Sequence, residues 1–186
     1  MTTLSIFNQN QPETAHTVTS DPRVIRETLA SLGVRFEQWP TRNLPAEADQ
    51  ETILEVYAKE VSRLKQECGF QTADVVSLTP DHPQKEAFRQ KFLDEHTHSE
   101  DEVRFFVRGQ GLFYLHFGDQ VYAVMCEKND LISVPDGTRH WFDMGAEPEF
   151  TCIRLFTNPD GWVADFTGED IANRLPRYES LAGVAV

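Results

Sequence analysis

The sequence predicts an α+β chain, mainly β, in which short strands form a barrel or sandwich and helices pack outside it. Two observations support this class. From Phe92 onward, short β-type runs follow one another, separated by Gly, Asn, Asp or Pro residues. Before Phe92, apolar residues recur at helical spacing in some segments and alternate in others. We expect a single domain over 1–186, with N-terminal strands and helices over 1–91, the barrel core over 92–157 and a C-terminal extension over 158–186.

The N-terminal part carries clear helix signals. Asp21 and Pro22 suit an N-cap and a first helical position, and Gly33 suits the residue that follows the helix end. A second apolar stripe at helical spacing runs from Glu51 to about Gln66 and predicts one helix. With the remaining segments, we predict helices over 22–32, 51–66 and 83–91, and strands over 4–7, 34–39 and 74–78.

The barrel strands are predicted from the turn signals between apolar runs. Gly109-Gln110-Gly111 is expected to be a turn that separates two strands. The strands expected in this part of the chain are 103–107, 112–117, 121–126, 131–134, 140–144 and 150–156. A short helix is expected in the tail, from about Glu169.

The composition excludes several classes of protein. Lys and Arg number 17 and Asp and Glu number 30, so the net charge is −13. This balance does not fit a protein that binds nucleic acid or anionic lipid. No apolar run approaches the roughly 18 residues of a membrane span, no secretory signal is visible, and three widely spaced cysteines suit a reducing compartment. We expect a cytoplasmic protein without nucleic-acid or membrane partners, and a monomer because no coiled-coil pattern is present.

Four residues of the β region suggest a metal site. His96 and His98 lie on one side of an extended segment, because side chains alternate with period two. Glu102 begins the next strand, and His140 follows a Pro-x-Gly turn. Three imidazoles and a carboxylate suit a first-row divalent ion, and an octahedral ion would keep two positions for a bidentate substrate. A lone His-x-His pair is usually a solvated turn or a core pair, so the prediction depends on all four residues together.

The spacing of these residues resembles the two motifs of the cupin superfamily. The matching residues are His96, His98, Glu102 and Gly109, followed by Pro135, Gly137 and His140. The chain departs from the motifs where glycine, glycine and asparagine are usual, at Gln90, Asn129 and Met144. The resemblance implies a cupin double-stranded β-helix barrel with flanking helices.

Within the cupins, the stretch 95–106, Arg154 to Phe156 and Trp162 resemble the acireductone dioxygenase family of methionine salvage. The resemblance implies that the four residues above bind one Fe(2+) or Ni(2+) ion per chain. It also implies a small-molecule substrate, an enediol beside a ketone with a methylthioethyl tail, that reacts with O2. In this family the Fe(II) form yields formate and 2-keto-4-methylthiobutyrate, and the Ni(II) form yields methylthiopropionate, formate and carbon monoxide.

The strand that begins at Glu102 suggests a residue with a catalytic role. Glu102, Arg104 and Phe106 share one face of this strand, so Arg104 points toward the metal if Glu102 does. A buried guanidinium there would stabilise a dianionic substrate and lower the pKa of its enediol. The alternative is that Arg104 pairs at the rim with Glu95, Glu100 or Asp101.

Other residues are candidates with two open interpretations each. Arg154 either binds substrate or forms a structural ion pair. Glu95 and Asp101 either hydrogen-bond a ligating imidazole or are ordinary solvated acids. The candidates for contact with the thioether tail, each of which could equally be a core residue, are Phe92, Phe142 and Trp162.

Two other functions remain open from the sequence. One is another cupin dioxygenase or isomerase that acts on a different chelating enol or enolate. The other is a non-catalytic cupin, such as a sensor, in which the metal is structural or absent. Retention of all four ligand residues argues against a pure binding protein.

Overall fold

The structure is a computed structural model that describes residues 1–158 and 163–183. Its strands are β1 (Thr3–Asn8), β2 (Thr17–Thr19), β3 (Arg35–Gln38), β4 (Thr72–Leu78), β5 (His96–Thr97), β6 (Glu102–Phe117), β7 (Gln120–Glu127), β8 (Asp130–Val134), β9 (Arg139–Asp143), β10 (Phe150–Phe156) and β11 (Asp165–Phe166). Its helices are α1 (Pro22–Ser31), α2 (Gln50–Val56), α3 (Ala58–Cys68), α4 (Lys85–Leu93), α5 (Ile171–Arg174) and α6 (Tyr178–Leu181).

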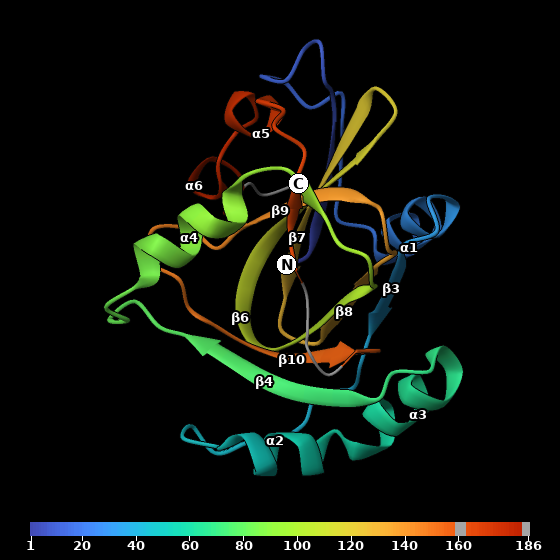
Figure 1. The fold of residues 1–186 in the computed structure, drawn as a ribbon, viewed down its shortest axis with the longest axis vertical. Helices are drawn as coiled ribbons and strands as arrows, with labels where there is room; N and C mark the ends of the chain where they lie inside the picture. The colour runs from blue at the N-terminus through green and yellow to red at the C-terminus, as the bar shows by residue number, and fades with distance from the viewer. Residues whose placement is uncertain (159–162, 184–186) are drawn as a thin grey trace.

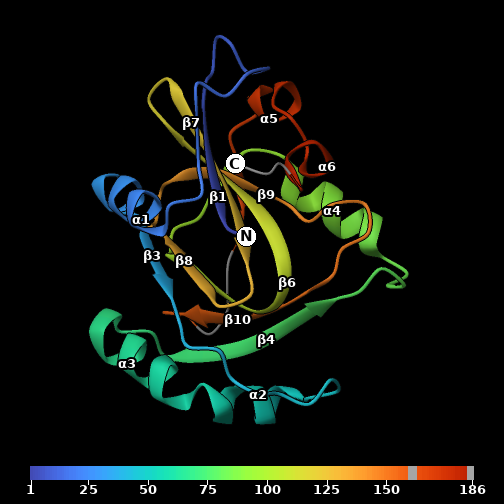
Figure 2. The same ribbon diagram turned by 180° about the vertical axis from the view of Figure 1, so that it is seen from behind.

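The strands form two antiparallel sheets that share the long, curved strand β6 (Figure 1). One sheet has the order β2-β1-β7-β6-β9-β5-β11, and the other has the order β3-β8-β6-β10-β4. The two sheets enclose a core to which both contribute, and the helices lie outside (Figure 2). The predicted α+β class, mainly β with flanking helices, is confirmed.

The side chains of β6 alternate between the two faces of the sheet, so this strand contributes to hydrophobic clusters on both faces. Val103 and Phe105 point outward and pack under α2 and α3. Phe106 points inward, into the core between the sheets. Because neighbouring side chains of a strand face opposite sides, Glu102 and Arg104 share the inward face with Phe106, as predicted. The barrel interior therefore receives a carboxylate and a guanidinium from the start of β6.

The first helix forms as the sequence predicts. The Asp21 side chain accepts a hydrogen bond from the backbone N–H of Arg23, and Pro22 occupies the first helical position. Ile25 and Leu29 are buried against the barrel. Gly33 has φ of +78°, the left-handed conformation in which glycine commonly ends a helix.

The prediction of one helix over 51–66 is wrong, because the chain forms α2 and α3 with a break at Tyr57. The backbone of Tyr57 has φ of −102° and ψ of 15°, outside the helical range. Its side chain is fully buried between the two helices and the sheet, with ring centroids 4.8 Å from Phe105 and 6.2 Å from Trp39. The apolar stripe continues through the break, which is why the sequence pattern does not reveal it.

The predicted turn at 109–111 is also wrong, because β6 runs through it without interruption. Gly109 has φ of +68°, and a side chain there would collide with the carbonyl of Glu149. The register with β10 shifts beside it, between Thr151 and Cys152. Gly109 therefore marks a bulge and a close approach of the β6 and β10 backbones, where β6 passes from one sheet to the other.

The tail forms α5 and α6, which confirms the short helix expected from about residue 169. The short strands β2, β5 and β11 are too brief to leave a sequence pattern. Among the described residues, no helix is long and apolar enough to cross a membrane.

Candidate metal centre

The structure brings together the four residues that the sequence proposes as ligands. One potential ligand atom of each of His96, His98, Glu102 and His140 lies within 4.8 Å of the others, and we call this cluster the metal centre. All four side chains are buried, with at most 8% of each residue exposed. Pairing of β5 with β9 sets His96 opposite His140. Three separate segments of the chain thus converge on one point inside the barrel.

Backbone carbonyls fix the orientation of all three imidazoles. Nδ1 of His96 lies 2.7 Å from the carbonyl oxygen of Asp94, and Nδ1 of His140 lies 2.7 Å from that of Thr138. Nδ1 of His98 lies 2.8 Å from the carbonyl oxygen of Val163. A carbonyl can only accept, so each Nδ1 carries the proton and donates it. In the neutral rings, Nε2 is therefore the nitrogen with a lone pair, which is the arrangement typical of metal-ligating histidines.

The Glu102 carboxylate tests whether this cluster suits a cation. Its Oε2 lies 2.9 Å from Nε2 of His140 and 3.1 Å from Nε2 of His98. With both rings neutral, these atoms are acceptors that face one another, which is unfavourable without a positive charge between them. A proton or a metal ion supplies that charge. Three imidazole nitrogens with a carboxylate fit a first-row divalent ion.

The titration behaviour of the cluster follows from burial and from mutual charge. Burial raises the pKa of Glu102, but the charge of Arg104 and the close contacts with His140 and His98 hold it well below its ordinary value. Burial and the neighbouring His140 lower the pKa of His96 to about 4. For His98, burial lowers the pKa, but the hydrogen bond and the charge of Glu102 outweigh it and raise the pKa overall. An anionic Glu102 and a neutral His96 are thus ready as ligands near neutral pH.

Arg104 lies directly behind the carboxylate. Its Nε donates to Oε1 of Glu102 at 2.7 Å, and the residue is only 4% exposed. Its guanidinium carbon lies 4.8 Å from the ring centroid of Phe142 and 5.7 Å from those of Phe92 and Phe113. Among the described residues, Arg104 pairs with Glu102 rather than with Glu95, Glu100 or Asp101, the rim partners considered from the sequence. Aromatic faces hold the charge by cation–π attraction.

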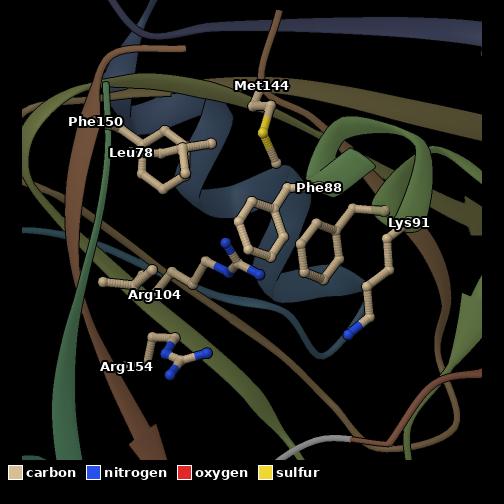
Figure 3. Close-up of a pocket in the computed structure, with 9 residues that line it drawn as sticks. Leu78, Phe88, Lys91, Arg104, Met144, Phe150 and Arg154 are labelled. Atoms are coloured by element: carbon tan, nitrogen blue, oxygen red, sulfur yellow. The ribbon is translucent and has the colours of Figure 1, made fainter. Parts of the chain in front are cut away.

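A pocket of about 210 Å³ opens on Arg104 (Figure 3). We call it the apolar pocket, because most of its wall is hydrocarbon or aromatic. In Figure 3, Phe88 and Lys91 of α4 lie on one side and Arg104 and Arg154 on the other, with Met144 above. Its lining is Val76, Leu78, Phe88, Lys91, Phe92, Arg104, Met144, Phe150 and Arg154.

Arg154 forms the structural ion pair that the sequence left open, and its contact with substrate stays a prediction. It lines the apolar pocket, and its guanidinium also makes a two-pronged contact with the Asp74 carboxylate, at 2.8 and 2.6 Å. Asp74 lies directly opposite Arg154 where β4 pairs with β10. Its charge is thus already matched by a carboxylate.

The structure does not bring Glu95 to a ligand imidazole. Glu95 is buried, but its carboxylate contacts Nδ1 of His116 at 2.5 Å and accepts from the Thr167 hydroxyl at 2.8 Å. His96 points into the metal centre, and adjacent residues of an extended chain face opposite sides, so Glu95 points away. Asp101 accepts from the backbone N–H of Asp136, within the turn that precedes His140. This hydrogen bond holds that turn in place.

The aromatic candidates are only partly placed by the structure. Phe92 lines the apolar pocket, whereas Phe142 is 1% exposed and packs on Arg104, Phe113 and Phe150. Trp162 lies outside the described residues. Phe88 and Lys91 were missed, although with Phe92 they have the i, i+3, i+4 spacing that places side chains on one helix face.

Comparison with known proteins decides the family. The family model described as ARD/ARD' matches residues 3–164. The chain belongs to the ARD/ARD' family. The match covers both the N-terminal helices and the barrel. It confirms the resemblance to acireductone dioxygenases seen in the sequence.

Relatives within this family are similar over their whole length. The chain is 81% identical to an acireductone dioxygenase of Marinobacter nauticus over 100% of both chains. It is 63% identical to an acireductone dioxygenase of Hahella chejuensis, over 97% of this chain and 98% of the relative.

A solved structure of the family shares the fold. The chain matches an acireductone dioxygenase from Bacillus anthracis, described with a cadmium ion in its active centre, with a TM-score of 0.80. The match has 30% sequence identity and covers 89% of this chain and 98% of the other. The cupin architecture predicted from the motifs is thereby confirmed.

Proposed function

We propose that the chain is a metal-dependent acireductone dioxygenase, which cleaves acireductone with O2 and acts in methionine salvage. The observation that carries this proposal is the contact between Arg104 and Glu102. It joins the metal centre to a pocket with apolar walls and cationic groups, which suits an anionic enediolate with a thioether tail. Membership of the ARD/ARD' family supports the same reaction.

The ligands we propose for the ion are His96, His98, Glu102 and His140, with one Fe(2+) or Ni(2+) per chain. Their donor set fits either ion, since both accept imidazole and carboxylate ligands. When bound, the ion would supply Lewis-acid chemistry to the oxygens of the substrate. The identity of the ion would determine the products, as the family resemblance implies.

Backbone hydrogen bonds prepare the ligands for this role. Because the carbonyls of Asp94, Thr138 and Val163 hold the three rings, little rotational freedom is lost when an ion binds. Arg104 keeps Glu102 ionised and shields one of its oxygens. The protein therefore presents a preorganised set of donors.

Arg104 also faces the apolar pocket and can meet the substrate there. A guanidinium is always charged at physiological pH, so it stabilises a dianionic enediolate and lowers the pKa of its second hydroxyl. The walls around it suit the methylthioethyl tail. Sulfur packs well against aromatic rings, which Phe88, Phe92 and Phe150 provide. Met144, where related motifs have asparagine, adds a flexible apolar contact to the wall.

We extend the proposal to the organisation of the chain. One domain over 1–186 is supported by three core clusters that join the N-terminal helices, the barrel and the tail helices. The acidic charge and the free cysteines support a monomeric enzyme of the cytoplasm without nucleic-acid or membrane partners.

The test is to add acireductone to metal-loaded protein without oxygen and then admit O2. We expect the ultraviolet absorbance of the substrate to disappear and formate to accumulate, with carbon monoxide only from the Ni(II) form. No turnover with either Fe(II) or Ni(II) would overturn the proposal. Turnover of a different chelating enol, with acireductone untouched, would favour another cupin dioxygenase or isomerase, and metal binding without any turnover would favour a non-catalytic cupin.

A further inference from the structure

The three cations of the apolar pocket differ in how their charge is balanced. Arg104 contacts the Glu102 carboxylate at 2.7 Å, and Arg154 contacts the Asp74 carboxylate at 2.6 Å. Lys91 forms no ion pair with any carboxylate in residues 1–158 and 163–183. Its ammonium instead lies 5.7 Å from the centroid of the Phe92 ring. Lys91 is therefore the pocket cation whose charge is free to act on a ligand.

The position of Lys91 links this charge to the reaction. The Phe92 ring is near both cations, since its centroid lies 5.7 Å from the Lys91 ammonium and 5.7 Å from the guanidinium carbon of Arg104. Lys91 is exposed, whereas Arg104 is buried beside the metal centre. The pocket thus has one cation at its solvent side and another at its inner end. Figure 3 shows the Lys91 side chain extended from α4, with its ammonium on the side of the pocket away from Met144.

The net charge of the chain makes an exposed pocket cation important. At −13, the protein as a whole repels an anion, and the acireductone enediolate is an anion. Local positive charge at the mouth of a cleft with low-dielectric walls raises the local substrate concentration and the association rate, by about 10-fold or more. Arg104 and Arg154 are each neutralised by a carboxylate, so they contribute less to such a field.

From these observations we propose that Lys91 is the substrate-capture residue of this enzyme. It attracts the anionic enediolate to the apolar pocket and holds it before it reaches Arg104. This inference rests on the proposed function for the identity of the anion. Lys91 is not a ligand of the metal centre, and it takes part in substrate binding rather than in the chemical step.

A different role for Lys91 would be purely structural. It lies in the last turn of α4, where a cation also stabilises the helix dipole. That role would change the thermal stability of the protein but would leave its affinity for the substrate and the salt dependence of the reaction unchanged. The two roles therefore predict different measurements.

The experiment compares Lys91→Met, which keeps the apolar stem and removes the charge, with Lys91→Arg and Lys91→Glu. The matched control is Lys85→Met, because Lys85 is on the same helix but pairs with Glu147 at 2.7 Å. For each metal-loaded variant, acireductone is titrated without oxygen to obtain Kd from the shift in its ultraviolet spectrum. Steady-state rates are then measured with O2 over a range of ionic strength, and metal content is checked by elemental analysis.

We expect Lys91→Met to raise Kd and KM about 10-fold, with kcat within a factor of two and metal content unchanged. Lys91→Glu should raise both further, Lys91→Arg should restore them, and Lys85→Met should match the wild type. The fall of kcat/KM with added salt should be weaker in Lys91→Met than in the wild type. Wild-type Kd, KM and salt dependence in Lys91→Met would overturn the inference, as would an equal loss of kcat and kcat/KM.

The two readouts separate this inference from the proposed function. If the wild type binds acireductone without oxygen but does not turn it over with O2, the proposed function fails while the Kd values still decide the role of Lys91. If the wild type turns over acireductone and Lys91→Met is indistinguishable from it, only the inference on Lys91 fails. Absence of any binding by the wild type overturns both.

Discussion

Glu102 and Glu37 are both glutamates with arginine partners, but Glu102 lies in the metal centre and Glu37 lies in a structural ion-pair network. Both carboxylate oxygens of Glu37, on β3, accept hydrogen bonds. Oε1 accepts from Arg35 at 2.6 Å, and Oε2 accepts from the indole of Trp39 at 2.9 Å. Arg63 adds a contact to each oxygen. Arg35 and Arg63 in turn reach Glu67, which closes the network on the surface of the protein.

The Glu102 carboxylate is satisfied on one side only. Oε1 accepts from Arg104, but Oε2 faces the Nε2 atoms of His98 and His140, whose Nδ1 protons are already committed to backbone carbonyls. The comparison teaches that the arginine partner does not distinguish a structural carboxylate from a functional one. The distinction lies in whether the second oxygen meets donors or other acceptors. Where it meets acceptors inside a buried cluster, a cation is needed to complete the arrangement.

The largest effect that tests this comparison is expected from the paired variants Glu102→Gln and Glu37→Gln. Glu102→Gln removes the charged ligand, so we expect loss of the bound metal and a loss of activity of more than about 100-fold, which is the upper range for outer-shell residues. Glu37→Gln should leave both the metal content and the activity per folded molecule near wild type. Elemental analysis and kcat/KM measurements check both expectations, and full metal loading of Glu102→Gln would contradict the assigned ligand.

Arg104→Ala is the next variant by size of effect. Its guanidinium lines the apolar pocket in which we propose that the substrate binds, so we expect kcat/KM to fall about 100-fold, comparable to the loss of a preorganised charge at a reacting centre. Metal content should be retained, because the four ligands remain. Arg154→Ala is the matched control, and since Arg154 is neutralised by Asp74 its kcat/KM should fall by less than about 10-fold. Loss of metal in Arg104→Ala, measured by elemental analysis, would refute the role given to Arg104.

The ligands of the metal centre could be predicted from the sequence because their spacing is itself geometric. His96 and His98 share a side of an extended segment, and Glu102 and Arg104 share a face of β6, through the same period of two. Asn129, which replaces a usual glycine, has φ of +79° and keeps the same backbone conformation. Local rules of this kind hold whatever the rest of the chain does.

The surroundings of the ligands could not be predicted, because they depend on distant segments. The carbonyl that orients His98 belongs to Val163, 65 residues further along the chain. The apolar pocket is closed by α4, and an apolar helix face has the same pattern whether it covers a solid core or a cavity. The glycines at 109 and 111 predict a turn from the sequence, but glycine suits the positive φ of a turn and of a bulge equally. Only the pairing of β6 with β10 distinguishes the two.

Removal of the metal should lower the stability of the protein through the metal centre around Glu102, and the Glu37 network should not contribute to this change. An ion that binds the native state at about 100 times its Kd stabilises that state by about 2.7 kcal/mol, or roughly 5–10 °C in Tm for a chain of this length. Thermal unfolding with and without a chelator measures the difference. Glu37→Gln should show the same increment as the wild type, whereas Glu102→Gln should show none. The increment should shrink in acid, because the raised pKa of His98 makes protons compete with the ion.

The smallest effect expected is the acid sensitivity that Glu37 contributes to folding. Burial raises the pKa of Glu37, but hydrogen bonds from Arg63, Trp39 and Arg35 lower it to about 2, below the ordinary value of 4.5. A carboxyl with a depressed pKa stabilises the native state fully above its unfolded-state pKa, and this contribution is lost as the pH falls from about 4.5 toward 2. We expect it to be about 2 kcal/mol at neutral pH, because the side chain is 23% exposed and solvent screens the pairs.

Urea unfolding of metal-free wild type and Glu37→Gln at pH 7 and pH 3 measures this contribution. The free energies of unfolding should differ by about 2 kcal/mol at pH 7 and by less than about 1 kcal/mol at pH 3, whereas exposed Glu13→Gln should differ from wild type at neither pH. A Glu37→Gln penalty that is equal at both pH values would mean that hydrogen bonds to the neutral side chain, rather than its charge, hold the network together. In that case Glu37 would need only hydrogen-bond donors, whereas Glu102 would need a cation at its second oxygen.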